Sequence, residues 1–270
     1  KLCPKVRRLS RKRELNPVQK AYIISTGTEL MLGSTVDTNS VFLSRHLTAL
    51  GFKVVGKNTV GDSEQYIREA FRQGMQTADL VVSSGGLGPT RDDLTREAVC
   101  RELGLELLLR KDEAENLKEF FRKRHREMPE ANFKQVMFPV GAKALKNVVG
   151  TAPGMYLEHA GKTLILLPGP PREMEKMFLE QVMPILKTKY DLVDRVVRKT
   201  IKILGPGESQ VEAILGNIGE QYRGLSMALL ARDGEVHVKI SAEGENREHT
   251  CRMVDDAAAR IGKLLGGHIF

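Results

Sequence analysis

The chain has 270 residues, which is enough for one large domain or for a large and a small one. A hydrophobic content of 41% and a charged content of 28% are typical of a soluble globular protein. The formal net charge is +8, but residues 1–20 contain eight Lys or Arg and a single Glu, so the rest of the chain is almost neutral. The high net charge therefore does not indicate that the folded part binds nucleic acid.

Residues 1–17 form a basic tail that we expect to be disordered. The tail is a solvated extension or, as an alternative, a weak polyanion-binding arm. It lacks the apolar core of a signal peptide, and no window of the sequence approaches a membrane span. Cys3, Cys100 and Cys251 form neither a CxxC pair nor a disulfide framework, which favours a reducing, cytoplasmic location.

Strands and helices alternate after the tail. A short apolar strand at 21–24 ends in hydroxyl, glycine and carboxylate residues, the composition expected at the ligand edge of an open α/β sheet. Possible N-cap residues at 37–40 precede a helix over 41–50. The same reasoning predicts a strand, a helix and a strand at 52–60, 64–77 and 79–83. This alternation predicts a doubly wound, mainly parallel sheet with its sites at the carboxyl edge.

The middle of the chain departs from this alternation. Residues 110–131 form a long charged stretch that we expect to be an outer helix with a solvated face, in preference to a lid or dimer arm. Two strands at 155–158 and 163–167 are predicted to form a hairpin. Prolines near residue 170 then mark the entry into another helix.

The pattern changes again near residue 191. Strands are expected at 195–204, 225–231 and 235–242, with helices from 208 and over 247–265. This βαββα order indicates a separate small α+β domain. We therefore divide the chain into the tail, a domain at 18–190 and a small domain at 191–270.

The segment Ser83–Thr95, SSGGLGPTRDDLT, combines glycines with two adjacent acids. Glycines at 85, 86 and 88 allow the backbone to approach a ligand and to adopt positive φ. Amides near the following helix can face an anion, and Asp92 and Asp93 are hard oxygen donors for a divalent cation. Taken alone, the segment is better explained by a surface turn whose aspartates cap a helix.

Five motifs occur together in the order in which one family carries them. They are STGTELMLGSTVDTNS (25–40), TVGDS (59–63), SSGGLGPTRDDLT (83–95), NVVGTAPG (147–154) and LPGPPREM (167–174). Together they resemble the MoaB/MogA-type molybdopterin-binding fold and, more closely, the amino-terminal part of the CinA family. The small domain resembles the KH-like module that follows in CinA proteins.

This resemblance implies a substrate class. CinA amino-terminal domains are similar to metal-dependent pyrophosphatases that split ADP-ribose into AMP and ribose 5-phosphate, and a related domain of FAD synthases is linked to FAD hydrolysis. Many family members also carry a carboxyl-terminal nicotinamide mononucleotide deamidase domain. Since the sequence ends after the KH-like helix, we expect no deamidase activity. The expected cofactor is a divalent cation, either Mg, Mn or Co.

The resemblance and the residue chemistry together assign roles. Asp92 and Asp93 are the expected metal ligands, Asp62 is a further ligand or the base that orients water, and Glu173 is a third metal carboxylate or an ordinary first-turn helix acid. Three groups of substrate-binding residues are expected. The phosphate contacts are Gly85, Gly86, Gly88 and Thr90, and the ribose or base is held by Thr26, Gly27, Glu29, Asp37 and Asn39, of which Asn39 can also cap its helix. The pocket walls are Pro153, Gly154, Pro168, Gly169 and Pro170 with Pro171.

Two other functions stay open at this stage. The first is molybdopterin binding or adenylylation, and the second is a non-catalytic nucleotide-binding scaffold. RNA binding by the KH-like unit is not expected, because Glu208 replaces the last glycine of its GxxG loop and would place an acid beside a phosphate. We expect the partners to be a small nucleotide pyrophosphate and a second copy of the chain, with no membrane contact.

Overall fold

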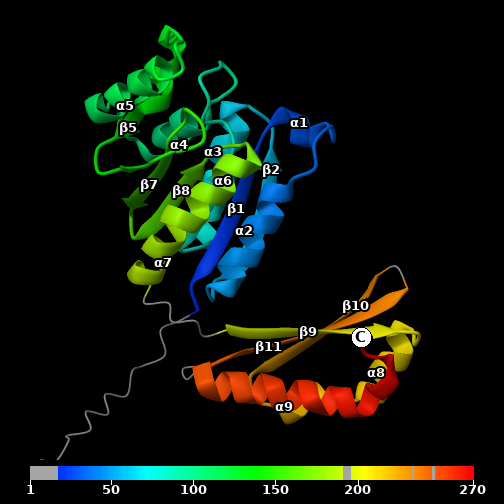
Figure 1. Ribbon diagram of the computed structural model, residues 1–270. Helices are drawn as coiled ribbons and strands as arrows, with labels where there is room; N and C mark the ends of the chain where they lie inside the picture. Colours follow the sequence, from blue (N-terminus) through cyan, green and yellow to red (C-terminus); the bar gives the residue numbers. More distant parts are fainter. Residues whose placement is uncertain (1–17, 191–195, 233, 245–246) are drawn as a thin grey trace, which may run out of the picture.

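The computed structural model describes residues 18–190, 196–232, 234–244 and 247–270, and the predicted tail at 1–17 lies outside these ranges. The described chain forms a larger unit on a six-stranded sheet and a smaller unit on a three-stranded sheet (Figure 1). The predicted architecture is confirmed: a mainly parallel α/β sheet is followed by a small α+β unit.

The six-stranded sheet has the order β2-β1-β3-β8-β7-β6. Strands β2, β1, β3 and β8 are parallel neighbours, whereas β7 pairs antiparallel with both β8 and β6. The strands are β1 (Lys20–Thr26), β2 (Lys53–Val60), β3 (Leu80–Ser84), β6 (Lys143–Leu145), β7 (Gly154–His159) and β8 (Lys162–Leu167). Parallel pairing brings the carboxyl ends of four strands to one edge, where the connecting loops can share a ligand.

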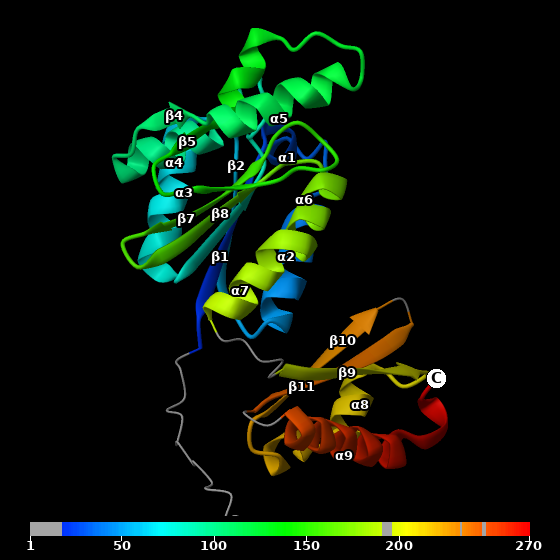
Figure 2. The same ribbon diagram turned by 60° about the vertical axis from the view of Figure 1, so that its left-hand side comes forward.

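Helices cover both faces of this sheet (Figure 2). The helices of the larger unit are α1 (Thr28–Met31), α2 (Thr38–Ala49), α3 (Glu64–Thr77), α4 (Thr95–Leu103), α5 (Lys111–Arg122), α6 (Pro171–Met177) and α7 (Met183–Lys189), with a 3₁₀ segment (Glu130–Val136) and a π-helical turn (Phe178–Val182). A separate two-stranded sheet joins β4 (Leu107–Leu109) to β5 (Met137–Pro139).

The alternation of side chains along β1 explains the two-sided core. Tyr22 and Ile24 pack with α3 and α4, whereas Ala21 and Ile23 pack with α2 and the α6–α7 segment. All four residues are buried. A strand that is apolar on both faces is the signature of a parallel sheet covered on both sides.

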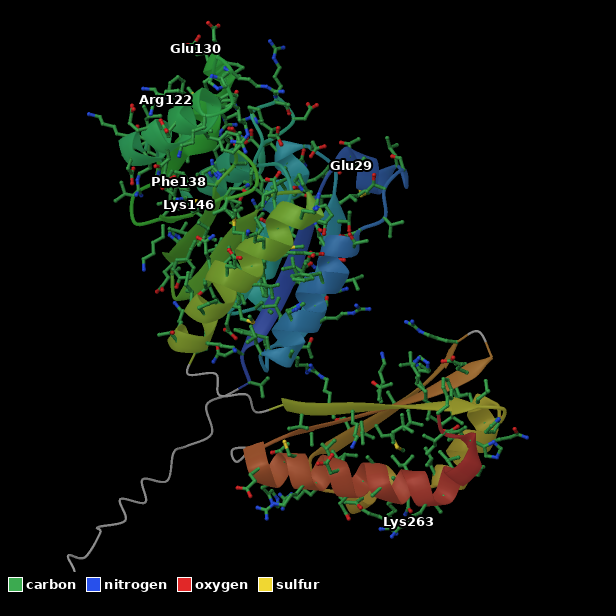
Figure 3. The ribbon with its side chains drawn as sticks, viewed as in Figure 1. Glu29, Arg122, Glu130, Phe138, Lys146 and Lys263 are labelled. Atoms are coloured by element: carbon green, nitrogen blue, oxygen red, sulfur yellow. The ribbon has the colours of Figure 1, made fainter. Side chains whose placement is uncertain are left out.

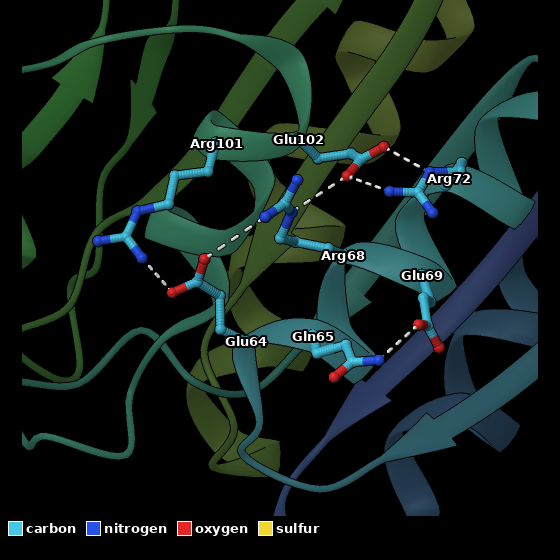
Figure 4. A network of polar contacts seen from close by, with 7 residues as sticks. All are labelled: Glu64, Gln65, Arg68, Glu69, Arg72, Arg101 and Glu102. Atoms are coloured by element: carbon cyan, nitrogen blue, oxygen red, sulfur yellow. Dashed lines mark hydrogen bonds and ion pairs between the residues drawn. The ribbon is translucent and has the colours of Figure 1, made fainter.

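A network of ion pairs and hydrogen bonds joins α3 to α4 on the outer surface (Figure 4). The Glu102 carboxylate accepts hydrogen bonds from Arg72, at 2.7 and 2.8 Å, and from Arg68 at 3.1 Å. Glu64 pairs with Arg101 in the same network. The hydrogen bond from Arg72, reinforced by Arg68, holds the pKa of the Glu102 carboxyl below its usual range.

We expect Glu102→Gln to lower the melting temperature modestly at neutral pH and to have no effect in acid. Because folding depresses the Glu102 pKa, the ionised carboxylate stabilises the fold above the unfolded-chain value, near 4.3. That contribution is lost as the pH falls through the folded-state pKa. Thermal melts of both proteins between pH 3 and 7 test this, and a temperature difference that persists in acid would contradict it.

The structure corrects the long helix expected over 110–131. Helix α5 ends at Arg122, and His125 adopts a positive φ of 51°. Pro129 precedes the 3₁₀ segment, and a proline disfavours helical geometry in the residue before it. The charged pattern could be read as one helix because it continues through a turn.

The smaller unit has the predicted βαββα order. Its elements are β9 (Val196–Leu204), α8 (Glu208–Leu215), a 3₁₀ turn (Ile218–Gln221), β10 (Leu225–Arg232), β11 (Glu235–Glu243), α9 (Arg247–Leu265) and a 3₁₀ turn (Gly266–His268). The strands form an antiparallel sheet in the order β10-β11-β9. Ile203 and Val238 of this sheet share one core with Ile261 of α9 and with residues of α8. In Figure 3, Lys263 lies on the outer side of α9. Within the described ranges, none of the helices has both the length and the apolarity that crossing a membrane requires.

Candidate functional site

The loops at the carboxyl ends of β1, β2, β3 and β8 surround a cavity of about 590 Å³. The segment from Gly85 to Asp93 forms one wall, and the turn before α6 forms another. Glu29, on the short helix after β1, lies at the same end of the larger unit (Figure 3). The cavity therefore lies where the strand–loop pattern predicted it.

Close packing makes the glycine-rich turn possible only with glycine. Gly85 has a φ of 110°, and a Cβ there would collide with the backbone carbonyl of Thr26. Gly86 has a φ of 64°, and a Cβ would strike the hydroxyl of Thr95. The Thr26 and Thr95 hydroxyls lie 3.1 Å apart and are buried. The turn thus packs against both the end of β1 and the start of α4.

Gly85→Ala is expected to lower the free energy of unfolding by about 2 kcal/mol or more. The substitution combines a strained positive φ with a steric clash against a backbone atom that cannot move independently of β1. Gly104→Ala provides a matched control, because Gly104 also has positive φ but open space around it. Urea unfolding measures both, and equal destabilisation would show that the contact with Thr26 contributes nothing.

Five carboxylate side chains line the cavity, and none of its described lining residues is Lys, Arg or His. The carboxylates are Glu29, Asp62, Asp92, Asp93 and Glu173. They come from four segments, the short helix α1, the loops after β2 and β3 and the first turn of α6, that meet at the sheet edge. A purely acidic set repels an anionic ligand unless a cation is bound between them.

Hydrogen bonds hold three of the carboxylates, Asp62, Asp93 and Glu173. Asp62 accepts from the amide of Thr28 at 2.8 Å. Asp93 Oδ2 accepts from the amide and the hydroxyl of Thr90, at 2.9 and 2.6 Å. Oδ2 thus stabilises the turn before α4, whereas Oδ1 has no hydrogen bond from the described residues. The alternative that the aspartates cap a helix is wrong, because α4 has Leu94 at its N-cap and no side-chain cap hydrogen bond.

The carboxylate of Glu173 contacts the loop at 147–151. It accepts a hydrogen bond of 2.6 Å from the Asn147 amide, and a Cβ on Gly150 would collide with it. Glu173 therefore connects the first turn of α6 to the loop at 147–151. That loop also lines the cavity through Thr151.

The donor set suits a cation that is shared with a ligand. No group of three or more His, Cys, Asp or Glu side chains in the described ranges is close enough to enclose a metal ion. Mg²⁺ needs no such cage, since it is usually held by one or two carboxylates, phosphate oxygens and water. Adjacent Asp92 and Asp93 on the cavity wall meet that requirement.

Asn39, expected to hold the ribose or base and also able to cap its helix, is not the cap. Helix α2 begins at Thr38, and its cap is Asp37, whose Oδ1 accepts from the Ser40 amide at 2.9 Å. Asn39 lies inside the first turn and donates to Ser84 Oγ and Gly169 O, both at 2.7 Å. Asp37 and Asn39 line a small adjoining cavity of about 70 Å³ and not the main one.

Pro153 and Gly154, expected to wall the pocket, do not line this cavity. Gly154 is buried at the start of β7, where a Cβ would approach Met177 Sδ at 2.5 Å and the Leu166 carbonyl at 2.8 Å. The Pro153 carbonyl accepts a 2.8 Å hydrogen bond from Arg96. Both residues therefore support the wall from behind.

The remaining predicted residues line the cavity. They are Thr26, Gly27, Glu29, Asp62, Gly85, Gly86, Gly88, Thr90, Asp92, Asp93, Pro168, Gly169, Pro170, Pro171 and Glu173. Sequence reasoning missed Thr35, Leu87, Pro89, Gln135, Thr151 and Ala152. All of these except Gln135 stand inside the quoted motifs and could have been included, whereas nothing near Gln135 indicated a site.

Fold and cavity together define the class of protein. A family model described as a probable molybdopterin binding domain matches residues 22–188, which include every residue lining the cavity. A second model, described as the damage-inducible protein CinA KH domain, matches residues 198–270. The chain belongs to the CinA family.

Relatives with both units support this assignment. A CinA-like protein of Syntrophomonas wolfei subsp. wolfei is 51% identical over 253 residues, covering 93% of this chain and 61% of the relative. A CinA-like protein of Kosmotoga olearia is 39% identical and likewise covers 93% of this chain and 60% of the relative. The chain thus spans about three fifths of the length of these curated relatives.

The larger unit also matches a solved structure. The crystal structure of the protein CinA with unknown function from Thermoplasma acidophilum is 35% identical in sequence, with a TM-score of 0.57. The match covers 65% of this chain and 99% of that chain.

Proposed function

We propose that the chain hydrolyses a nucleotide pyrophosphate with the help of a divalent cation, with ADP-ribose as the leading substrate and AMP and ribose 5-phosphate as products. The observation that supports this most strongly is the charge of the cavity. A glycine-rich turn suited to phosphate faces a lining whose charged side chains are all acidic. A pyrophosphate can be held there only when a cation offsets the carboxylates.

Magnitudes support the need for a cation. Two like charges 4 Å apart repel by about 4 kcal/mol at the effective dielectric of a protein surface. A hydrogen bond to a charged group contributes about 1.5–3 kcal/mol. Backbone amides of the turn alone are therefore too weak to hold a doubly charged group beside several carboxylates.

The chain's residues divide the work of the reaction. Asp92 and Asp93 would hold the cation, and the backbone of the turn at 85–88 would orient the phosphates. Asp62, fixed by the Thr28 amide, would accept a proton from the water that attacks one phosphorus as the bridging P–O bond breaks. A bound cation supplies charge neutralisation for the phosphate oxygens.

Incubation with ADP-ribose tests the proposal. AMP is followed by chromatography in the presence of Mg²⁺, Mn²⁺ or Co²⁺ and, separately, of EDTA. We expect AMP with at least one cation and none with the chelator. An absence of product with every cation, from protein shown to be folded by circular dichroism, would reject the hydrolase.

Molybdopterin binding is the second candidate, because the model matching residues 22–188 is described as a probable molybdopterin binding domain. Tight binding of the pterin without turnover of ADP-ribose would favour it. A non-catalytic nucleotide-binding scaffold would bind AMP and release no product. The cytoplasmic location and the homodimer stay predictions, and sedimentation of the purified chain would measure its oligomeric state.

A further inference from the structure

A second cavity, of about 680 Å³, lies beside the main one between β2 and α3. Asp62 lines both cavities, so the two adjoin at that residue. The second cavity is lined by residues of the β2 end and its loop, by α1 and by one side of α3. These are Thr28, Met31, Asn58, Thr59, Val60, Gly61, Asp62, Ser63, Tyr66, Glu69, Ala70 and Gln73.

The main cavity has room for a pyrophosphate but has no aromatic side chain among its described lining residues. A nucleotide also carries a flat heterocycle, which proteins commonly bind by stacking on an aromatic ring. The proposed function therefore needs a neighbouring surface for the base. The lining of the second cavity contains Tyr66.

We propose that the cavity between β2 and α3 binds the base of the nucleotide whose pyrophosphate occupies the main cavity, with Tyr66 as the stacking surface. This inference rests on the proposed function and names the part of the substrate that the neighbouring cavity recognises.

Tyr66 is available for stacking. Its side chain is 57% exposed, and within the described part of the chain no ring or cation packs on it. Met31, 58% exposed, adds a second apolar surface in the same cavity. The side-chain amide of Gln73 makes no hydrogen bond to described residues and can pair with the polar edge of a base.

The charge of the cavity selects the same occupant. Its charged lining residues are Asp62 and Glu69, both acidic. Its described lining lacks an adjacent pair of aspartates like the one proposed to hold the cation in the main cavity, so a phosphate would be repelled there, whereas a neutral base would not be. This separates the two ends of the ligand: the phosphates, with their cation, stay in the main cavity, and the base extends past Asp62.

A competing location for the base is less suitable. A third cavity, of about 360 Å³, adjoins the main one at Thr151 and contains Phe120. The guanidinium of Arg124 already lies 3.5 Å from the centre of that ring. One face of Phe120 is therefore occupied by a cation–π contact, which a base would have to displace.

Tyr66→Ala tests the inference against Phe120→Ala, a matched loss of an aromatic ring from the other neighbouring cavity. We expect Tyr66→Ala to raise the KM for ADP-ribose about tenfold with kcat unchanged, because stacking binds substrate and transition state alike. Tyr66→Phe keeps the ring and should restore the wild-type KM. Phe120→Ala should leave KM unchanged.

Direct binding separates failure of this inference from failure of the proposed function. Calorimetry with AMP and with ribose 5-phosphate, each with Mg²⁺, needs no turnover. We expect Tyr66→Ala to weaken AMP about tenfold and to leave ribose 5-phosphate unchanged. Because the chain contains no tryptophan, Tyr66→Trp also provides a single tryptophan whose fluorescence AMP should quench.

The outcomes are distinguishable. Weakened AMP binding without ADP-ribose hydrolysis would retain the base site and reject the hydrolase. Hydrolysis with an unchanged KM in Tyr66→Ala, or a raised KM in Phe120→Ala alone, would retain the hydrolase and reject the base site. Failure of the wild-type chain to bind AMP at all would also reject the base site.

Discussion

Asp93→Asn is expected to lower cation-dependent hydrolysis of ADP-ribose by at least about a hundredfold, while the melting temperature stays close to that of the wild type. Asparagine keeps an oxygen that can accept from the Thr90 amide and hydroxyl, so the turn can persist. The substitution removes one negative charge from the cation's ligands, and loss of one preorganised electrostatic contact typically costs 10²–10³ in rate. Initial rates over a range of Mn²⁺ concentrations measure the effect.

The dependence of the hydrolysis rate on Mn²⁺ concentration shows whether Asp93 acts by binding the cation. If Asp93 binds the cation, raising Mn²⁺ should restore part of the lost rate in Asp93→Asn. Glu106→Gln is a matched control, because Glu106 is an exposed acid that does not line the cavity. Wild-type rates in Asp93→Asn at every Mn²⁺ concentration would mean that the cation lies elsewhere.

Arg96→Met is expected to lower the free energy of unfolding by about 3 kcal/mol or more and the melting temperature by roughly 6–12 °C. Arg96 is 3% exposed and donates to the carbonyls of Gln135, Lys134 and Pro153, at 2.7, 3.4 and 2.8 Å. Its guanidinium also lies 4.4 Å from the centre of the Phe138 ring. Methionine fills similar space but leaves the buried carbonyls without donors.

The setting of Arg96 is unusual, since no carboxylate forms an ion pair with it among the described residues. Burial lowers the pKa of its guanidinium to about 10, so the group still carries its charge at neutral pH. Arg96→Lys should recover only part of the stability, because an ammonium cannot reproduce the fork of donors. A melting temperature within about 2 °C of wild type for Arg96→Met would show that these carbonyls need no donor.

These carbonyls also matter for the site. Gln135 lines the cavity, and Pro153 follows the lining residues Thr151 and Ala152. Arg96 thus joins α4, which follows the glycine-rich turn, to two other walls of the cavity. A loss of stability in Arg96→Met should therefore accompany a weaker affinity for substrate.

The position of the site could be predicted from the sequence because parallel strands deliver their following loops to one edge. Thr26 is the last residue of β1, and Asp62 lies two residues after the end of β2. Their meeting with Asp92 follows from strand order alone. The sequence motifs assigned all five carboxylates, from Glu29 to Glu173, to the site. The structure was needed to show that none of the described lining residues is Lys, Arg or His.

Other features depend on tertiary contacts that no local pattern encodes. Gln135 belongs to a 3₁₀ segment without periodicity, and Arg96 has the appearance of an ordinary helix-surface charge. Asn39 is a residue type typical of helix caps, yet its side chain donates hydrogen bonds to β3 and to the loop after β8. The partners of Arg96 lie 38, 39 and 57 residues away in the chain, and those of Asn39 lie 45 and 130 residues away. The Gln135 side chain donates to Thr151, 16 residues away.

Binding of an ADP-ribose analogue with a methylene bridge between its phosphates tests most directly whether a cation joins ligand and cavity. The bridge cannot be hydrolysed, so affinity is measured without turnover. We expect calorimetry to show binding with Mg²⁺ or Mn²⁺ and at least about a hundredfold weaker binding in EDTA, since the lining carboxylates then face the phosphates directly. Equal affinity in EDTA and in Mg²⁺ would contradict a cation-bridged pyrophosphate site.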